Sequence, residues 1–335
     1  MPAPAIPPWT TRVVNQLLAI KPLWNLARGQ ARAMMVKRAE SIGVSWPERV
    51  QELRSRHGDL ELSPLWQTDL EALQNPELTY PGYYTTSFHA YDEGNLGWQP
   101  AMEVEVAALA VHTKLWPGAG AQGDARLRQS YHEVLAAQLP QAPEAIVDLG
   151  CGVGMSTETL QALYPQAQIT GVDLSPYFLA VAQYRQQENA QGGHSQPLEE
   201  AQSHDSANAP DPTNPAITWH HAAAENTGLP SGAYDLVSAC LVFHELPQSA
   251  AQAVIHEAHR LLRPGGHLAI MDMNPQSEVY KTMPPFVFTL LKSTEPYLDE
   301  YFSLDIAAAF AAAGFEPPRI TCNSPRHRTI IGRVG

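Results

Sequence analysis

The sequence has few cysteines and no long apolar run, and both absences limit what the protein can be. Three cysteines in 335 residues provide no disulfide framework and are typical of a reducing compartment. No stretch approaches the roughly 18 apolar residues of a membrane-spanning helix, and the N-terminus lacks the basic start of a signal peptide. We therefore expect a cytoplasmic protein without stable membrane insertion, for which peripheral contact with a membrane stays open.

Charge is also scarce, and its sign is unbalanced. Charged residues make up 16% of the chain, and the formal net charge is −13. A negative field opposes binding to the phosphates of nucleic acids. Hydrophobic residues make up 44%, which is enough for a sizeable core. We expect a globular protein with no nucleic-acid partner, and the oligomeric state stays open.

The first 123 residues lack the regular alternation of strands and helices that follows them. Helices are expected at 23–39, 47–56 and 100–115, and a turn-rich aromatic stretch at 79–98. The sequence WPGAGAQGD at 116–124 is typical of a linker. We therefore predict an N-terminal extension over residues 1–123 and a catalytic domain over residues 124–335, with a substrate lid as the hypothesis for the extension.

Beyond residue 124, strands and helices alternate. Strands are expected at 145–149, 168–172, 217–221, 234–243, 267–272, 319–323 and 327–333. This alternation predicts an α/β fold with a mostly parallel sheet and helices on both faces, and the final hairpin predicts one antiparallel strand at its edge. Residues 188–215 contain hardly any large apolar side chain, so we predict a disordered insertion there.

The sharpest motif is a glycine-rich loop, IVDLGCGVG at 146–154, where a strand ends and a helix follows. Glycines allow a ligand to approach the main chain closely, beyond the carboxyl ends of the strands. The dinucleotide fingerprint G-x-G-x-x-G/A fails here, because Met155 or Thr157 occupies the last position. Asp148 would repel a pyrophosphate, and it suits the ammonium group of a methionine moiety.

A second acid indicates a nucleoside. The next strand ends in GVDLS at 171–175, and Asp173 can accept hydrogen bonds from both hydroxyls of a ribose. Sites for NAD share this acid, so it does not discriminate between ligands. An NAD-dependent oxidoreductase stays an alternative, which the failed third glycine and Asp148 disfavour.

Four motifs occur in the order typical of one enzyme family: VDLGCGVG, GVDLS, AAENTGLPSGAYDLVSA and LLRPGGHLAIMDMNP. Together they resemble class I methyltransferases that use S-adenosylmethionine (SAM), most closely the ubiquinone/menaquinone-biosynthesis type. The phrase SFHAYDEGNLGW is similar to uncharacterised cyanobacterial and plastid members. The resemblance covers residues 124–335. It implies SAM as cofactor and a Rossmann-like seven-stranded sheet of order 3-2-1-4-5-7-6.

The resemblance also implies a set of cofactor-binding residues. Asp148 and the loop residues would line the methionine part of SAM, Asp173 the ribose, and the others the adenine or the sulfonium; the set is Asp148, Gly150, Cys151, Gly152, Asp173, Leu174, Ala224, Glu225, Cys240 and Leu241. One position departs from the family. Ala223 stands where Asp is common, so the amino group of adenine needs another acceptor.

Methyl transfer requires a base only when the nucleophile must lose a proton. His244 follows the fourth strand, and as a neutral imidazole it would suit proton removal near pH 7; the alternative role is to cap the loop. A polar cluster is the candidate lid, with a hydrogen-bonded turn as the alternative: His89, Tyr91, Asp92 and Glu93. No convincing carboxylate set for a metal is visible, so none is expected.

The resulting hypothesis is transfer of a methyl group from SAM to a small, lipophilic or aromatic acceptor. The apolar segment 283–291 falls where the resembling fold covers its acceptor, and ordinary core packing is the alternative. A non-catalytic SAM-fold protein, acting in binding or assembly, is the alternative function. The acceptor and the methylated atom, whether oxygen, nitrogen or carbon, stay open.

Overall fold

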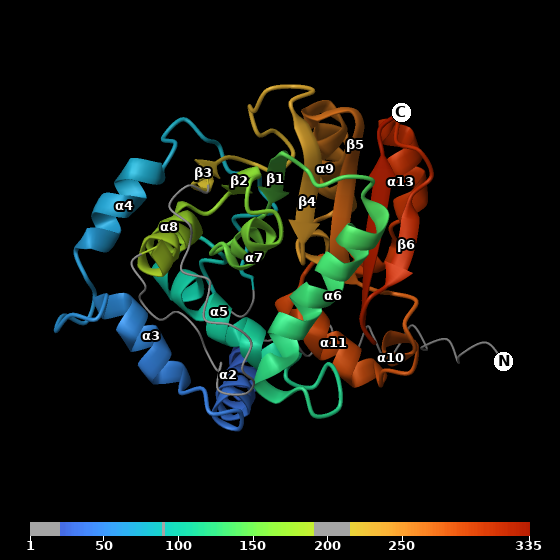
Figure 1. Ribbon diagram of the computed structural model, residues 1–335. Coiled ribbons are helices and arrows are strands. Elements are labelled where there is room, and N and C mark those ends of the chain that lie inside the picture. The colour runs from blue at the N-terminus through green and yellow to red at the C-terminus, as the bar shows by residue number, and fades with distance from the viewer. Residues whose placement is uncertain (1–20, 89–90, 191–214) are drawn as a thin grey trace.

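The computed structural model describes residues 21–88, 91–190 and 215–335, and its centre is a seven-stranded sheet (Figure 1). The strands are β1 (Ala145–Leu149), β2 (Gln168–Asp173), β3 (Thr218–His221), β4 (Tyr234–Cys240), β5 (Leu262–Met273), β6 (Arg319–Cys322) and β7 (His327–Arg333). Their order is β3-β2-β1-β4-β5-β7-β6, which confirms the order that the resemblance implied. Most of the predicted insertion at 188–215 lies outside the described residues.

The sheet is parallel from β3 to β5 and antiparallel on both sides of β7. The predicted hairpin is present, but its antiparallel strand is not the outermost one, because β7 lies between β5 and β6. Burial agrees with this order. Residues 327–332 of β7 are all buried, whereas β6 has no buried residue, as expected for an inner strand and an edge strand.

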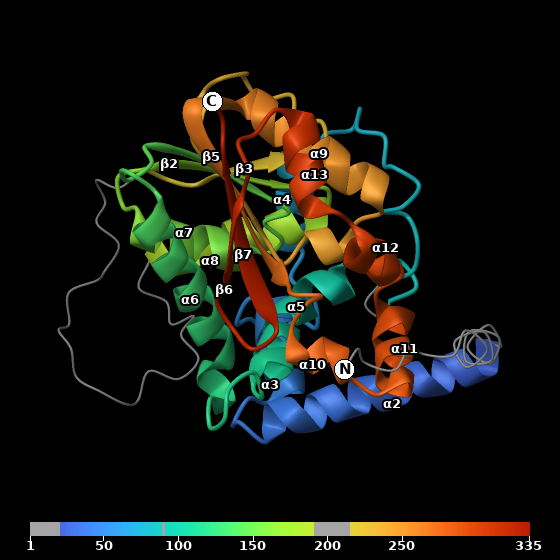
Figure 2. The same ribbon diagram turned by 90° about the vertical axis from the view of Figure 1, so that its right-hand side faces the viewer.

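Helices cover both faces of the sheet. Figure 2 shows α6 (Gly123–Gln138) and α7 (Met155–Leu163) on one side, and α9 (Gln248–Leu261) and α13 (Ile306–Ala313) on the other. Neighbouring side chains of a strand point to opposite faces. Ile146 therefore joins the core under α6 and α7, while Val147 joins the core under α9 and α13. Helix α8 (Pro176–Ala190) packs against β2 and β3.

The N-terminal region contributes four described helices: α2 (Lys21–Glu40), α3 (Trp46–Ser55), α4 (Leu65–Leu73) and α5 (Trp98–His112). Helix α4 was not predicted. Trp66 on α4 is fully buried, in one cluster with Met102 of α5, Phe178 of α8 and Val153 of the glycine loop. Figure 1 shows α5 beyond the arrowheads of the central strands. The N-terminal helices therefore reach the end of the sheet where the loops carry the predicted site.

A second covering segment lies between β5 and β6. It contains α10 (Glu278–Lys281), α11 (Pro285–Thr294) and α12 (Leu298–Ser303), which precede α13. Two short 3-10 helices lie outside this segment, η1 (Gly120–Gln122) before α6 and η2 (Phe243–Glu245) after β4. The apolar segment 283–291 falls mostly within α11. No helix in the described part of the chain combines the length and apolar character needed to cross a bilayer.

Replacing Phe310 tests the core between the sheet and α13. Phe310 is fully buried and packs so closely on β7 that a Cβ on Gly332 would lie 2.4 Å from its ring. Phe310→Ala should lower the free energy of unfolding by about 3–5 kcal/mol, measured by chemical denaturation. Leu65→Ala, at a side chain that is 56% exposed, is the control. Equal losses in the two variants would contradict this packing.

Candidate functional site

The glycine loop joins β1 to α7 in a backbone conformation that favours glycine. Gly150, Gly152 and Gly154 have φ angles of 66°, 55° and 83°, all in the left-handed region. A Cβ on Gly150 would lie 2.6 Å from Val242 Cγ2, and one on Gly154 would lie 2.7 Å from the ring of Trp219. The missing side chains therefore let the loop sit directly against the residues that follow β4 and against β3.

Asp148 is a buried carboxylate with one unpaired oxygen. Its side chain has no exposed surface, and Oδ2 accepts hydrogen bonds from Ser156 Oγ and Thr157 Oγ1, each at 2.7 Å. Oδ1 is buried and has no hydrogen-bond partner among the residues described. Burial raises the pKa of Asp148. A buried unpaired acceptor is costly, so a ligand that donates hydrogen bonds, such as an ammonium group, fits this oxygen.

Arg128 places a guanidinium beside the same loop, which the sequence did not reveal, and its side chain is 11% exposed. Its Nε donates to Asp124 Oδ2 at 2.8 Å, and Asp124 Oδ1 lies 2.7 Å from His112 Nδ1. The terminal nitrogens Nη1 and Nη2 have only sulfur atoms as hydrogen-bond partners among the described residues, Cys240 Sγ at 3.9 Å and Met155 Sδ at 3.8 Å. Sulfur is a weak acceptor, so the guanidinium retains strong donors for an anion.

Asp148 and Arg128 therefore offer opposite charges at one end of the glycine loop. Burial lowers the pKa of Arg128, but the Asp124 carboxylate outweighs this, and Asp148 adds to the rise. The guanidinium thus stays charged. A zwitterionic amino acid carries an ammonium for the carboxylate and a carboxylate for the guanidinium, so the pair suits the amino-acid part of a ligand.

Asp173 occupies the position that the sequence predicted, at the end of β2. Its Oδ2 accepts the N–H of Gly152 at 2.8 Å and its Oδ1 the N–H of Ser175 at 2.7 Å. The Tyr84 hydroxyl lies 3.5 Å from Oδ1. Burial raises the pKa of Asp173 to about 6. The carboxylate thus holds the glycine loop against β2, and its remaining lone pairs can accept from a ribose.

Glu225 supplies a further acceptor beyond β3. Its Oε1 accepts the hydroxyl of Tyr83 at 2.7 Å, while Oε2 is buried without a hydrogen-bond partner in the described chain. Ala223 and Ala224 precede it, and Ala223 accepts the N–H of Asn226 through its carbonyl at 3.1 Å. Since Ala223 has no polar side chain, Oε2 of Glu225 is the side-chain acceptor nearest in sequence that could replace the missing acid.

Residues 80–84 lie over the ends of β2 and β3, although they come long before these strands in the sequence. The Tyr80 hydroxyl is 3.3 Å from His221 Nε2, and the same ring nitrogen lies 3.0 Å from the carbonyl oxygen of Leu174. The rings of Tyr80 and Tyr84 are stacked at 6.3 Å. The aromatic stretch therefore approaches the predicted nucleoside end of the site, including Leu174.

The end of β4 combines a buried thiol, Cys240, with a strained backbone, and a second buried thiol, Cys151, lies in the glycine loop. Cys240 and Cys151 are buried and free; burial raises the pKa of Cys240 to about 12 and that of Cys151 well above its usual range. Both thiols are therefore protonated at neutral pH. Leu241 has a φ of 61°, which is uncommon for a residue with a Cβ. Such strain clusters at functional sites, and here it directs the chain toward η2.

His244 lies in η2, directly after β4, and is paired with Asp272 at the end of β5. Its Nδ1 is 2.8 Å from Asp272 Oδ1, and its backbone N–H donates to Oδ2 at 3.2 Å. Burial lowers the pKa of His244, but the Asp272 carboxylate outweighs burial and raises it to about 10. This carboxylate, which the sequence did not reveal, favours the protonated imidazole, and the catalytic role of His244 stays a prediction.

The described members of the predicted polar cluster at 89–93 have different surroundings in the structure. Tyr91 donates its hydroxyl to Glu103 Oε2 of α5 at 2.7 Å, and Asp92 and Glu93 are exposed. His89 lies outside the described residues. Nearby, the carbonyl of Asn95 accepts the Ser175 hydroxyl at 2.7 Å, which ties the segment to the end of β2. The lid role of the cluster stays a prediction.

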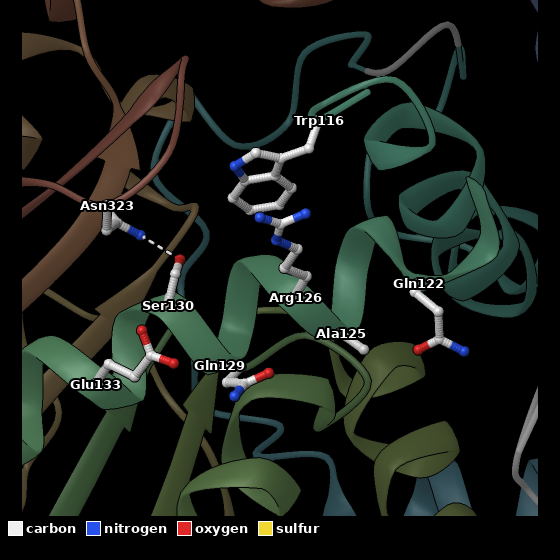
Figure 3. A pocket seen from close by; sticks show the side chains of 8 residues that line it. All are labelled: Trp116, Gln122, Ala125, Arg126, Gln129, Ser130, Glu133 and Asn323. Carbon is white, nitrogen blue, oxygen red and sulfur yellow. Dashed lines mark hydrogen bonds between the residues drawn. The ribbon is translucent and has the colours of Figure 1, made fainter. Parts of the chain in front are cut away.

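A surface cavity of about 490 Å³ lies elsewhere, beside α6 (Figure 3). It is lined by Trp116, Arg126, Ser130, Asn323 and neighbouring residues, and the Arg126 guanidinium lies 4.5 Å from the Trp116 ring centre. None of its lining residues belongs to the predicted cofactor set. Within the described ranges, no group of three or more His, Cys, Asp and Glu side chains is placed to hold a metal ion.

Comparisons with known proteins agree with this geometry. Residues 147–270 match a family model described as methyltransferase domain. The chain is 25% identical over 188 residues to an uncharacterized methyltransferase of Synechocystis sp., covering 56% of this chain and 74% of that protein. Residues 147–270 therefore carry a methyltransferase domain, and the strand order is that of class I SAM-dependent methyltransferases.

More distant similarities add detail. The chain is 35% identical over 164 residues to a trans-aconitate 2-methyltransferase of Methylobacterium nodulans, covering 47% of this chain and only 52% of that protein. A solved structure of magnesium protoporphyrin IX methyltransferase from Synechocystis, with bound S-adenosylhomocysteine, is 19% identical with a TM-score of 0.42, over 63% of this chain and 84% of that one.

The pKa of Asp173 predicts how SAM binding by this methyltransferase depends on pH. Because that pKa is about 6, the carboxylate predominates above pH 6 and the protonated acid below it. The acid accepts hydrogen bonds from ribose less well, so the association constant for SAM should fall as the pH drops through 6, approaching about tenfold per pH unit. Calorimetry between pH 5 and 8 measures this.

Asp173→Asn is the matched variant for that titration. It cannot ionise, so its weaker SAM binding should not change between pH 5 and 7. A wild-type association constant that is constant over the same range would contradict the placement of Asp173 at the ribose.

Proposed function

We propose that this methyltransferase transfers the methyl group of SAM to a small, lipophilic or aromatic acceptor. The observation that carries the proposal is an aromatic cluster beside the end of β5. The Phe302 ring lies 5.2 Å from those of Tyr280 and Phe288, and the neighbouring Tyr301 donates its hydroxyl to the Met273 carbonyl at 2.7 Å. Met273 follows Asp272, so the aromatic cluster lies next to the His244–Asp272 pair.

Two segments cover this end of the sheet, the N-terminal extension and the chain between β5 and β6. These two covering segments meet above this region, which supports an enclosed site for the acceptor. Tyr297, between α11 and α12, donates to the carbonyl of Tyr83 at 3.4 Å, and the two rings pack edge to face at 6.3 Å. Tyr83 in turn holds Glu225. A roof made from both segments would exclude water from the reacting groups.

For the cofactor, we assign roles to the buried groups described above. Asp148 Oδ1 would hold the ammonium group of SAM, directly or through water, and Arg128 its carboxylate. Asp173 would accept from the ribose, and Glu225 Oε2 from the amino group of adenine in place of the acid missing at Ala223. The glycine loop and residues 240–241 would border the methionine part.

The protein's contribution to the reaction is then mainly binding and alignment. SAM supplies an activated methyl group on a positively charged sulfur. The buried groups fix the amino-acid and nucleoside ends of SAM, and the aromatic cluster positions the acceptor, which is how enzymes accelerate in-line displacements. His244 is the polar side chain that we place closest to the acceptor.

In this proposal, the extension before residue 124 and the domain that follows it have different roles. The extension supplies residues 80–84 to the nucleoside end, and residues 124–335 supply the remaining groups. The cytoplasmic location and the small-molecule partner stay predictions that rest on composition and on the nature of the site.

Arg128→Met tests the cofactor assignment. Removing a charge-assisted hydrogen bond costs about 1.5–3 kcal/mol, so the affinity for S-adenosylhomocysteine should fall by about 10- to 100-fold. The affinity for 5′-methylthioadenosine, which lacks the amino-acid carboxylate, should not change. Calorimetry with both ligands measures the difference.

Arg126→Met is the matched control on the same helix, because Arg126 is exposed and stacks on Trp116. It should bind both ligands as the wild type does. If Arg128→Met weakens both ligands equally, the arginine supports the fold and does not bind the carboxylate.

The acceptor proposal is tested with SAM labelled in its methyl group. Purified protein and a deproteinised cell extract are incubated with labelled SAM, and the small molecules are separated. We expect the label in a compound that partitions into an organic solvent. Label found only in a polar, non-aromatic compound would contradict a lipophilic or aromatic acceptor, and SAM binding without any labelled product would contradict methyl transfer to a small molecule.

A further inference from the structure

Glu225 is placed at the nucleoside end of the site by the turn that follows β3. The N–H of Ala222 donates to the carbonyl of Asp173 at 3.2 Å, which ties the start of this turn to the end of β2. The N–H of Asn226 donates to the carbonyl of Ala223 at 3.1 Å, which closes the turn around Glu225. Glu225 is therefore held near Asp173, the acid that we assign to the ribose.

Two consecutive tyrosines of the N-terminal extension contact both acids. The Tyr83 hydroxyl donates to Glu225 Oε1 at 2.7 Å, and the Tyr84 hydroxyl lies 3.5 Å from Asp173 Oδ1. Consecutive Cα atoms are only about 3.8 Å apart, so one short segment reaches both carboxylates. A single nucleoside can therefore contact Asp173 with its ribose and Glu225 with its base.

Tyr83 is also held by contacts that do not involve Glu225. Its carbonyl accepts the hydroxyl of Tyr297 at 3.4 Å, the two rings pack edge to face at 6.3 Å, and Tyr83 packs against the core under α9 and α13. Burial, together with Glu225, raises the pKa of Tyr83, so its hydroxyl stays a donor. The Tyr83 hydroxyl is therefore a hydrogen-bond donor in a fixed position.

The two carboxylate oxygens of Glu225 differ in their surroundings. Oε1 accepts from Tyr83, whereas Oε2 is buried without a hydrogen-bond partner among the residues that the structure describes. A carboxylate can only accept hydrogen bonds, and a buried acceptor without a donor is costly. Because Tyr83 fixes Oε1, the rotation of the carboxylate and the place of Oε2 are fixed as well.

We propose that Tyr83 is a positioning residue for the nucleobase, because by holding Oε1 of Glu225 it directs Oε2 to the exocyclic amino group of adenine. This inference rests on the proposed cofactor assignment and goes beyond it, since it makes the site selective for adenosine over inosine ligands. The N-terminal extension then takes part in choosing the cofactor, at a site where Ala223 offers no polar side chain.

The selectivity follows from the hydrogen-bonding groups of the two bases. The exocyclic amino group of adenine is a donor, whereas the hypoxanthine base of inosine carries a carbonyl oxygen at the same position. With inosine, this oxygen would face Oε2 of Glu225, so two acceptors would meet and neither would gain a hydrogen bond. The amino group of adenine instead supplies the donor that Oε2 lacks.

The wild-type protein gives the first test. Calorimetry compares S-adenosylhomocysteine with S-inosylhomocysteine, which differs only in the carbonyl oxygen that replaces the amino group. We expect S-adenosylhomocysteine to bind about 10- to 100-fold more tightly. Equal affinities would overturn the inference and leave cofactor binding standing, whereas a protein that binds neither ligand would contradict the proposed function as well.

Glu225→Gln tests the contact with the base. Tyr83 would donate to the amide oxygen of the glutamine, which places the amide N–H groups where Oε2 of Glu225 lies. A donor would then face the base, so the preference should reverse and S-inosylhomocysteine should bind about 5- to 10-fold more tightly than S-adenosylhomocysteine. If this variant keeps the wild-type preference, Glu225 does not contact the base.

Tyr83→Phe, added to Glu225→Gln, isolates the positioning role. Without the Tyr83 hydroxyl, the glutamine amide can present either its oxygen or its N–H groups, so the two ligands should bind within about threefold of each other. A merely structural tyrosine would weaken both ligands alike and leave their ratio unchanged. A ratio that stays as in Glu225→Gln alone would therefore overturn the role of Tyr83.

Thr85→Val is the matched control, because it also removes one hydroxyl from the same segment. Thr85 is exposed, and its hydroxyl donates within the segment to the carbonyl of Gly82 at 3.2 Å. Added to Glu225→Gln, it should keep the reversed preference. If it abolishes the preference as Tyr83→Phe does, loosening of the segment is sufficient, and the specific role of Tyr83 is overturned.

Discussion

Asp148 and Arg128 are two charged side chains, one buried and one largely buried, that keep hydrogen-bonding groups without a strong partner among the described residues. Among the described residues, one oxygen of the carboxylate has no hydrogen-bond partner, and the terminal nitrogens of the guanidinium hydrogen-bond only to sulfur. Buried groups of this kind reduce stability unless a ligand completes them. Two neighbouring features, the glycine loop and the Asp124 carboxylate, serve this pair. The glycine loop allows a close approach beside Asp148, and Asp124 holds Arg128 in place with His112 on its other oxygen.

The parts that would recognise the acceptor lie outside the segment that matches the family. That match ends at residue 270, whereas Tyr83 and Tyr297, which join the two covering segments, lie before and after it. The Asp272 side of the His244 pair lies just beyond the match as well. This division gives a physical reason why the family identifies the cofactor and leaves the acceptor to be determined from the local chemistry.

The sequence predicted the features that depend on neighbours along the chain. The glycine loop, Asp173 and the position of His244 all follow directly from a strand end and its loop, and the resemblance supplied the strand order. Arg128 escaped prediction because its direction depends on how α6 packs across the sheet. The contact of His244 with Asp272 also escaped prediction, because Asp272 is 28 residues away and only the pairing of β4 with β5 brings it close.

The central claim is that one zwitterionic ligand end completes both buried charges, and the crystal structure of the complex with S-adenosylhomocysteine tests it most directly. We predict the ligand carboxylate about 3 Å from the terminal nitrogens of Arg128, and its ammonium group at Asp148 Oδ1, directly or through one water. An amino-acid end bound elsewhere, with Arg128 still facing Cys240 and Met155, would contradict the account.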